Sequence, residues 1–214
     1  MLRRTVCSML LLFAATAHAQ IRRQPQNINN TDPDYWVGLS LGYMEGVTLS
    51  DEQTGALWNF GYSTQLRATV EKTFSRGATV GLAAGFSSVP LNYQSGQMFS
   101  SDCGSCRADA EIDQYTAFVR IGGGTGFHGL YQFEGGVTQF TNFREHDSGN
   151  RLDPANGSYD GTLGFGGGIA YGLSRTSDIY ITEMLDFVFH RQNADIQQQA
   201  PRFFTFRGGF RFGF

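Results

Sequence analysis

The chain contains very little lysine and no long apolar stretch beyond its N-terminal segment. Lys72 is the single lysine among 214 residues, and 16 basic residues against 19 acidic ones give a formal net charge of −3. Such a balance offers no large basic surface for nucleic acid. A membrane-spanning helix needs roughly 20 consecutive apolar residues, and no later segment reaches that length. Nucleic-acid binding and helical membrane insertion are therefore not expected.

Glycine and phenylalanine are abundant instead. The sequence has 28 glycines and 19 phenylalanines, and aromatic residues make up 14% of it. Glycine destabilises helices, whereas aromatic residues fit the pleated surface of a sheet. The composition therefore favours an all-β fold over a helical bundle.

The N-terminus has the pattern of a secretory signal peptide. Two arginines, Arg3 and Arg4, precede an apolar run from Met9 to Ala15, and Ala17-His18-Ala19 forms a small-x-small cleavage site. The apolar run is too short to span a bilayer. The alternative is a short N-terminal helix of the folded domain.

We expect residues 1–19 to be removed, residues 20–34 to form a polar lead-in and residues 35–214 to form one domain. Loss of two arginines leaves 14 basic against 19 acidic residues, so the mature charge is −5.

Eight later segments alternate between apolar and polar residues. In residues 58–74, for example, Leu66 and Val70 share one face, and Arg67 and Glu71 share the other. Side chains of a strand point alternately to opposite faces, so each segment predicts a strand. The expected strands are 35–46, 58–74, 78–89, 113–125, 130–141, 159–172, 178–190 and 203–214.

The connections between these segments alternate in length. Three are tight, at 75–77, 126–129 and 174–177, and four are long, at 47–57, 90–112, 142–158 and 191–202. Short periplasmic turns and long extracellular loops are typical of transmembrane barrels, and all five prolines lie outside the expected strands. The pattern predicts an eight-stranded antiparallel up-and-down transmembrane β-barrel with both termini periplasmic. A soluble β-sandwich or a lipocalin-like barrel, with its apolar residues inside, is the alternative.

The last segment carries a phenylalanine face and ends on an aromatic residue. Phe210, Phe212 and Phe214 share that face with Phe204 and Phe206. This end resembles the C-terminal signature of bacterial outer-membrane β-barrels, which their assembly machinery reads. Over residues 35–214 the chain resembles the small eight-stranded OmpA/OmpX-like barrels.

The resemblance implies a location in the outer membrane of a Gram-negative bacterium. Its implied partners are periplasmic chaperones, the barrel-assembly machinery, outer-membrane lipids and lipopolysaccharide. It implies no single activity, because such barrels include adhesins, surface-stability proteins, narrow pores and lipid-modifying enzymes. We expect a monomer without a cofactor or a metal.

The polar face of the strands predicts a charged barrel interior. An eight-stranded barrel is just wide enough to be filled by side chains, and buried charges need partners. Register predicts that Arg120 lies opposite Glu134 and that Asp186 lies opposite Arg207. We expect a polar plug, with a narrow ion path as the alternative. Whether Asp186 or Glu183 points inward is left open. The expected network comprises Arg67, Glu71, Arg120, Glu134, Asp186, Arg207 and Arg211.

Two cysteines lie close together in the longest connection. Cys103 and Cys106 are separated by two residues, and an exported chain reaches an oxidising compartment. We expect a disulfide. A metal site or a redox pair is the alternative, although the nearby ligands are carboxylates and no thioredoxin-type helix is apparent.

One catalytic candidate lies in the third long connection. His146 and Ser148, with the later Asp160, resemble the His-x-Ser and acid of outer-membrane lipid A deacylases. A serine becomes nucleophilic when an oriented base lies beside it. That family carries a glutamate as its acid and places its motif on a lipid-facing strand, whereas here the triplet lies in a polar loop. We therefore expect a non-enzymatic barrel with a structural or surface-interaction role, with a small-solute pore or a lipid A hydrolase as alternatives.

Overall fold

The computed structural model of the chain is an all-β protein. Within the residues it describes, no helix is both long and apolar enough to cross a membrane. The expected signal peptide and residues 20–32 of the lead-in lie outside the described part. The structure describes residues 33–51, 54–96, 103–152, 157–190 and 201–214.

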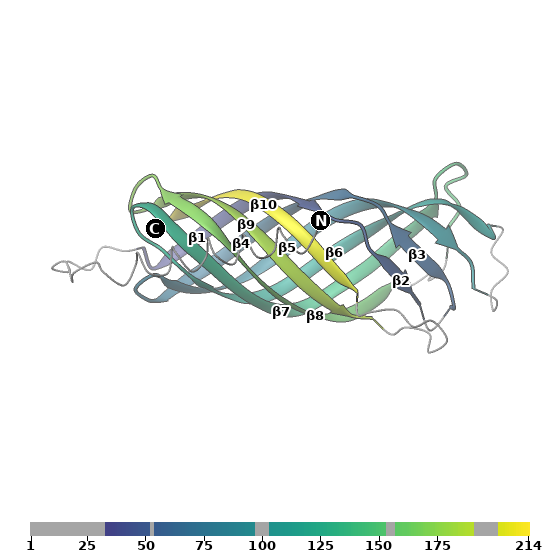
Figure 1. Ribbon diagram of the computed structural model, residues 1–214, viewed down its shortest axis with the longest axis horizontal. Coiled ribbons are helices and arrows are strands. Elements are labelled where there is room, and N and C mark those ends of the chain that lie inside the picture. Colours follow the sequence, from purple (N-terminus) through teal and green to yellow (C-terminus); the bar gives the residue numbers. More distant parts are fainter. Residues whose placement is uncertain (1–32, 52–53, 97–102, 153–156, 191–200) are drawn as a thin grey trace, which may run out of the picture.

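Eight of the strands close into an antiparallel barrel (Figure 1). Consecutive strands of the wall are neighbours, and β1 closes the ring by pairing with both β4 and β10. The predicted eight-stranded up-and-down barrel is therefore confirmed. The strands of the described chain are Tyr35–Met44 (β1), Thr48–Ser50 (β2), Leu57–Phe60 (β3), Ser63–Ser75 (β4), Ala78–Gln94 (β5), Ser105–Ile121 (β6), Gly126–Glu145 (β7), Ser158–Gly172 (β8), Ser177–Phe189 (β9) and Arg202–Gly213 (β10).

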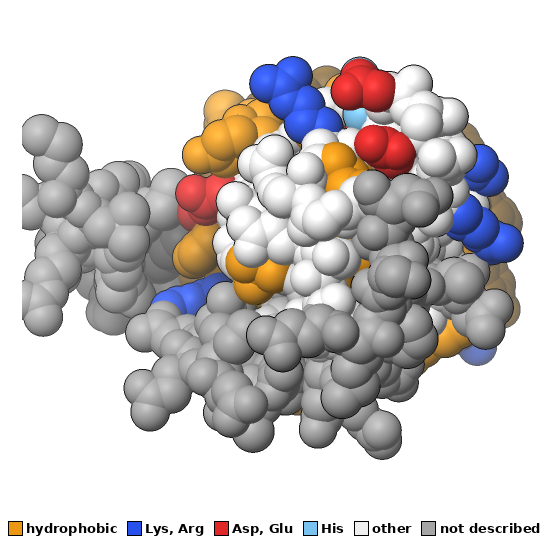
Figure 2. All heavy atoms as spheres, turned by 90° about the vertical axis from the view of Figure 1, so that its right-hand side faces the viewer, with side chains coloured by type: hydrophobic (Ala, Val, Ile, Leu, Met, Phe, Trp, Pro, Cys, Tyr) orange, Lys and Arg blue, Asp and Glu red, His pale blue; other side chains and the backbone are white. Residues whose placement is uncertain are grey.

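The two ends of the barrel differ. The short turns and the C-terminus lie at one end, on the left of Figure 1, which we call the turn end. The other end, which carries β2 and β3 and which we call the loop end, is shown face-on in Figure 2, where acidic and basic side chains are visible. Tyr35 and Phe214 join β1 to the C-terminus through two backbone hydrogen bonds of 3.2 and 2.9 Å.

The predicted strand 58–74 is wrong, because it is two strands. β3 pairs with β2 in a hairpin and continues the wall beside β5, where Phe60 lies opposite Leu91. The break between β3 and β4 lies at Gly61, whose N–H donates to the carbonyl of Pro90 over 2.7 Å. The expected loop 47–57 therefore contains ordered strand, and Phe60 points into the barrel rather than outward.

The expected long connection 90–112 is also much shorter than predicted. β5 and β6 stay paired as far as Gln94 and Ser105. Pro90 consequently lies inside a strand, contrary to the expectation for all five prolines. It is tolerated because β5 changes partner there: Ser87 is its last residue paired with β4, and Leu91 is its first paired with β3.

The second short turn is displaced from its predicted position. β6 ends at Ile121 and β7 begins at Gly126, so residues 122–125 form the turn. Gly122 and Gly124 have φ values of +124° and +140°, which residues with a Cβ rarely adopt. This glycine-rich segment therefore forms the turn, whereas the expected strand 113–125 includes it.

The wall has opposite polarity on its two faces along most of its length. Large apolar side chains point outward, among them Leu82 at 68% and Phe206 at 54% exposure, whereas inward residues such as Arg67 at 2% are polar and buried. The phenylalanine face of β10 is outward, as its alternation predicts. A lipid-exposed barrel has this arrangement, with an apolar exterior band and a polar interior.

This polarity reverses near the loop end. On β6 the inward residues change from Gln114 to Ile112 and Ala110, and the outward ones change from Tyr115 to Glu111. Above this level β5 and β6 are apolar inside and polar outside, like the strands of a water-soluble barrel. The reversal marks the height at which the outer surface no longer suits lipid.

Candidate functional site

The interior near the turn end is held by an ion-pair cluster centred on Glu71. Its carboxylate accepts hydrogen bonds from the guanidinium of Arg120, from Arg211 over 3.3 Å and from the hydroxyl of Thr79 over 2.7 Å. Arg211 also bonds Asp178 through two nitrogens, at 2.7 and 2.6 Å. The cluster thus balances two arginines with two carboxylates, as buried charges require.

These contacts cross the interior between strands that are not neighbours. Glu71 lies on β4 and Arg120 on β6, with β5 between them. The inner face of β5 is lined by small side chains, so long side chains can pass over it. At Gly81 an added Cβ would lie 2.7 Å from the Phe118 ring, which leaves no room for a larger residue.

A second ion-pair cluster lies between this one and the loop end. Arg67 of β4 donates to Glu134 of β7 over 2.6 Å, and Arg207 of β10 lies 3.5 Å from Asp186 of β9. Gly164 makes room for the second pair, because a Cβ there would collide with the carboxylate of Asp186. This cluster also pairs two arginines with two carboxylates.

Neither of the two pairs that we predicted from register lies directly opposite, although Arg207 and Asp186 still form an ion pair. Arg120 lies opposite Gln132 rather than Glu134, and Arg207 lies opposite Thr182 rather than Asp186. The connections are centred at other residues than we expected, so the residue that lies opposite each arginine differs from the predicted one by two or four positions. An even shift keeps every side chain on its predicted face, so these residues still point inward. Arg120 finds Glu71 two strands away, whereas Arg207 meets Asp186 on the neighbouring strand.

Above the clusters, His190 links three segments of the loop end. Its Nδ1 lies 2.7 Å from Asp160 of β8, and its Nε2 lies 3.5 Å from Asp51, which follows β2. Burial acts to lower the pKa of His190, but the two carboxylates outweigh it and raise the pKa to about 9. Burial acts to raise the pKa of Asp51, but its contacts with His190 and Thr54 outweigh this and lower it.

An apolar cluster fills the interior around and above His190. Trp58 is fully buried in it, and the centroid of its ring lies 4.6 Å from that of Phe143 and 5.1 Å from that of His190. We did not predict this cluster from the sequence. The reversal of polarity along β5 and β6 was the signal that could have revealed it. Its buried members are Met44, Leu49, Ala56, Trp58, Phe60, Val89, Leu91, Tyr93, Cys103, Ala108, Ala110, Ile112, Phe140, Phe143, Leu152, Val188 and Phe203.

The predicted catalytic triplet is not brought together. His146 pairs with Asp109 over 2.7 Å, and the hydroxyl of Ser148 donates to Glu145. Asp160 lies inside the barrel on His190 instead. Ser148 therefore lacks the neighbouring base that a nucleophilic serine needs, because β8 directs Asp160 inward while the histidine and serine lie in an exposed loop.

Cys103 and Cys106 form a disulfide, with their Cα atoms 5.9 Å apart. The carboxylate of Glu145 lies beside them, and the three potential ligand atoms are all within 4.8 Å of one another. Metal binding by cysteine requires the thiolate. Sulfur atoms bonded to each other do not supply it.

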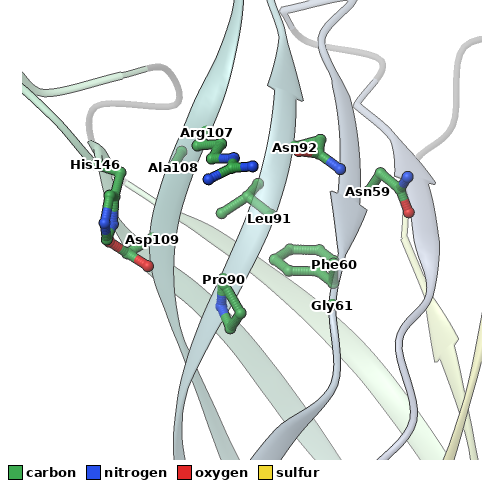
Figure 3. A pocket seen from close by; sticks show the side chains of 10 residues that line it. All are labelled: Asn59, Phe60, Gly61, Pro90, Leu91, Asn92, Arg107, Ala108, Asp109 and His146. Carbon is green, nitrogen blue, oxygen red and sulfur yellow. The ribbon is translucent and has the colours of Figure 1, made fainter.

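A pocket of about 460 Å³ lies on the outward face of the wall near the loop end (Figure 3). It spans β3, β5 and β6 and reaches the segment just after β7. Gly61 and Pro90 form part of its floor, and it lies above the level at which the outer surface becomes polar. Its polar side chains are those of Asn59, Asn92, Arg107, Asp109 and His146.

Comparisons with known proteins identify this architecture. Neisserial surface protein A (NspA) is 10% identical, with a TM-score of 0.55 over 85% of this chain and 97% of that one. The outer membrane protein OprG from Pseudomonas aeruginosa is 12% identical, with a TM-score of 0.58 over 88% and 99%. The chain has the fold of the small eight-stranded outer-membrane β-barrels. No protein-family model matches it, and no curated protein is significantly similar in sequence.

For an outer-membrane-type barrel, one outward residue is unusual. Glu183 faces outward on β9, between Ile181 and Leu185, while Asp186 is fully buried in the interior. The phase that the sequence left open is thereby decided. Ionisable groups on the lipid face of a barrel are costly, most of all near the middle of the membrane.

Proposed function

We propose that this protein is an integral outer-membrane barrel whose interior is closed to solutes and whose loop end serves surface interactions. The observation that carries the proposal is the filling of the interior at three levels. Two charge-balanced clusters lie below the apolar cluster, and representative side chains of each level, Glu71, Arg67 and Trp58, are at most 2% exposed.

The packing of the levels supports closure rather than conduction. Four arginines are matched by four carboxylates in the two clusters, so no net charge is left to attract ions of one sign. At the level of the apolar cluster the interior is packed with rings such as those of Trp58 and Phe140, both fully buried, and the nearby His190 is paired with Asp51 and Asp160. Transfer of an ion from water into apolar surroundings of this kind has a high free-energy cost.

The outer-membrane location is part of the same proposal. It is supported by the fold, by the apolar outward band and by the sequence pattern of a signal peptide. The proposal places the turn end in the periplasm and the loop end outside, with lipids and lipopolysaccharide around the wall. Assembly through the phenylalanine face that ends at Phe214 remains an expectation.

Conductance tests the closed interior. The purified protein, inserted in planar bilayers, should show no steady unitary currents. The double variant Trp58→Ala/Phe140→Ala, which removes two buried rings, is expected to show at least brief openings. A matched control is Phe86→Ala, because Phe86 faces outward at 47% exposure. Steady currents from the unaltered protein would refute closure and favour a narrow pore.

Labelling of intact cells tests the orientation. A membrane-impermeant maleimide should label Ser148→Cys, near the loop end, without permeabilisation. It should label Arg76→Cys, in the turn between β4 and β5, only after the outer membrane is opened. Reversed labelling would overturn the proposed orientation, and equal labelling of both variants in sealed cells would overturn the location.

A further inference from the structure

Four neighbouring strand segments align polar side chains along the upper edge of the outward pocket. Asn59 lies opposite Asn92, and Asn92 lies opposite Arg107. The next segment continues the row, since the N–H of His146 donates to the carbonyl of Arg107 over 2.9 Å. Adjacent strands are about 4.8 Å apart, so the row spans roughly 15 Å. Figure 3 shows three of these side chains beside one another above the pocket floor.

Several hydrogen-bonding groups of this row remain available to a ligand. The guanidinium of Arg107 and the amide of Asn92 have no side-chain hydrogen bond within the described residues. Asn59 uses its oxygen to accept from Thr48 over 3.1 Å, which leaves its two N–H donors. His146 binds Asp109 through Nδ1, which leaves Nε2. The unpaired groups are therefore mainly donors.

The charges around the pocket favour an anionic group at one end and hydroxyl groups at the other. Arg107 and His146 lie along the edge, and Arg144 lies opposite Asp109 in the register of β6 and β7. The hydrogen bond with Asp109 raises the pKa of His146, which favours its cationic form. Asp109, and Glu111 further along β6, repel an anion from the lower part of the pocket. The carboxylate of Asp109 can instead accept hydrogen bonds from hydroxyl groups there.

The geometry points to a binding site for a phosphorylated sugar in this pocket. The phosphate lies against Arg107 and His146, and the sugar hydroxyls bond Asn59, Asn92 and the carboxylate of Asp109. Charge-assisted bonds from arginine to phosphate are the strongest that this set of residues can make. The sugar lies over Gly61 and the flat ring of Pro90, in a volume of about 460 Å³ that suits a ligand larger than a single phosphate.

This inference rests on the proposed function in one respect: the proposed orientation decides from which side of the membrane the ligand reaches the pocket. Phosphorylated sugars occur in the head groups of lipopolysaccharide and as free saccharides. The outward pocket stands above the apolar band, beside the lipid head groups, so both sources can reach it.

Binding to the purified protein in detergent micelles tests the site itself. Titration with glucosamine 6-phosphate, followed by calorimetry, should show saturable binding that Arg107→Gln weakens at least tenfold. Glucosamine without phosphate should bind at least tenfold more weakly than the phosphorylated form. Arg76→Gln removes an exposed arginine at the opposite end of the barrel and should leave binding unchanged. Heat-modifiable gel migration verifies that each variant is folded.

Three results would overturn the inference: no saturable binding, equal binding by Arg107→Gln, or equal affinity for inorganic phosphate alone. The source is assigned by measuring the lipopolysaccharide that co-purifies from outer membranes. If less lipopolysaccharide co-purifies with Arg107→Gln than with the unaltered protein, the ligand is the head group. If equal amounts co-purify, although the unaltered protein binds the sugar phosphate, the ligand is a free saccharide.

The proposed function can fail separately. Conductance and cell labelling do not depend on Arg107, and binding in micelles does not depend on a closed interior or on orientation. A conducting protein that binds the sugar phosphate would refute closure and keep the site.

Discussion

Removing the negative charge of Glu71 should destabilise the barrel more than any other single charge neutralisation in the lower cluster. Glu71 is the carboxylate shared by Arg120 and Arg211. In Glu71→Gln, Arg211 keeps Asp178, but Arg120 keeps only uncharged partners among the described residues: Gln132, with hydrogen bonds of 3.1 and 2.9 Å, and the rings of Phe118 and Tyr180. One buried arginine is thus left without a counter-charge.

The expected loss follows from the cost of that unpaired charge. Removing one partner of a buried ion pair costs about 3–5 kcal/mol. The free energy of unfolding is measured in detergent micelles by urea titration, with tryptophan fluorescence as the signal. Trp36 reports on the cluster directly, because the guanidinium of Arg211 lies 4.5 Å from the centre of its ring.

Two further variants separate the charge from other effects. Glu111→Gln changes an exposed carboxylate that accepts a hydrogen bond from Asn142, and it should alter stability by no more than about 0.5 kcal/mol. The double variant Glu71→Gln/Arg120→Gln restores the charge balance, so its loss should fall short of the sum of the single losses by about 2 kcal/mol. A loss below about 1 kcal/mol in Glu71→Gln, or strict additivity in the double variant, would refute the reasoning.

Three other predictions concern different levels of the barrel. Trp58→Ala should lower the free energy of unfolding by about 3–5 kcal/mol, because it empties a buried aromatic site; a loss no larger than that of Phe86→Ala, monitored by circular dichroism, would contradict it. Glu183→Leu should stabilise the protein in lipid bilayers by up to about 2 kcal/mol, since it removes an ionisable group from the outward band; a lower melting temperature argues against lipid at that position. The folded pKa of His190, about 9, lies above the ordinary 6.5, so its stabilisation is complete below pH 6.5 and lost as the pH rises through 9. Melting temperatures from pH 6 to 10 should show this loss, and His190→Gln should abolish it.

The direction in which each side chain points was largely predictable within the membrane part of the wall. Strand periodicity is two, so apolar and polar alternation assigned Arg67 and Glu71 to one face and Leu66 and Val70 to the other. The misplaced turns moved partners by even numbers of residues, as between Gln132 and Glu134. Such errors leave the faces unchanged, and for this reason the residues expected inside are buried although neither predicted pair lies directly opposite.

The partners of two inward arginines, Arg120 and Arg67, could not be read from neighbouring strands. Arg120 reaches Glu71 over β5, and Arg67 reaches Glu134 over two intervening strands. These contacts depend on the curvature of the closed wall and on small side chains such as Gly81. Local register carries information about adjacent strands, and it carries none about residues that meet across the interior.

The loop end was the least predictable part. Phe60 lies inside, although alternation with Leu66 and Val70 placed it on the outward face. The expected connection begins at Pro90, because a proline removes a ladder hydrogen bond. Only the change of partner of β5, from β4 to β3, makes its position acceptable.

The sequence by itself determined that the wall is an eight-stranded antiparallel barrel and which face of most strands is apolar, because both follow from periodicity and the spacing of turns. The tertiary structure decided which charges meet, that Asp160 serves His190 rather than Ser148, and that four segments build one pocket around Arg107. The physical reason is that closure brings together residues far apart in the chain, at heights set by strand tilt and register, and no local pattern records those heights.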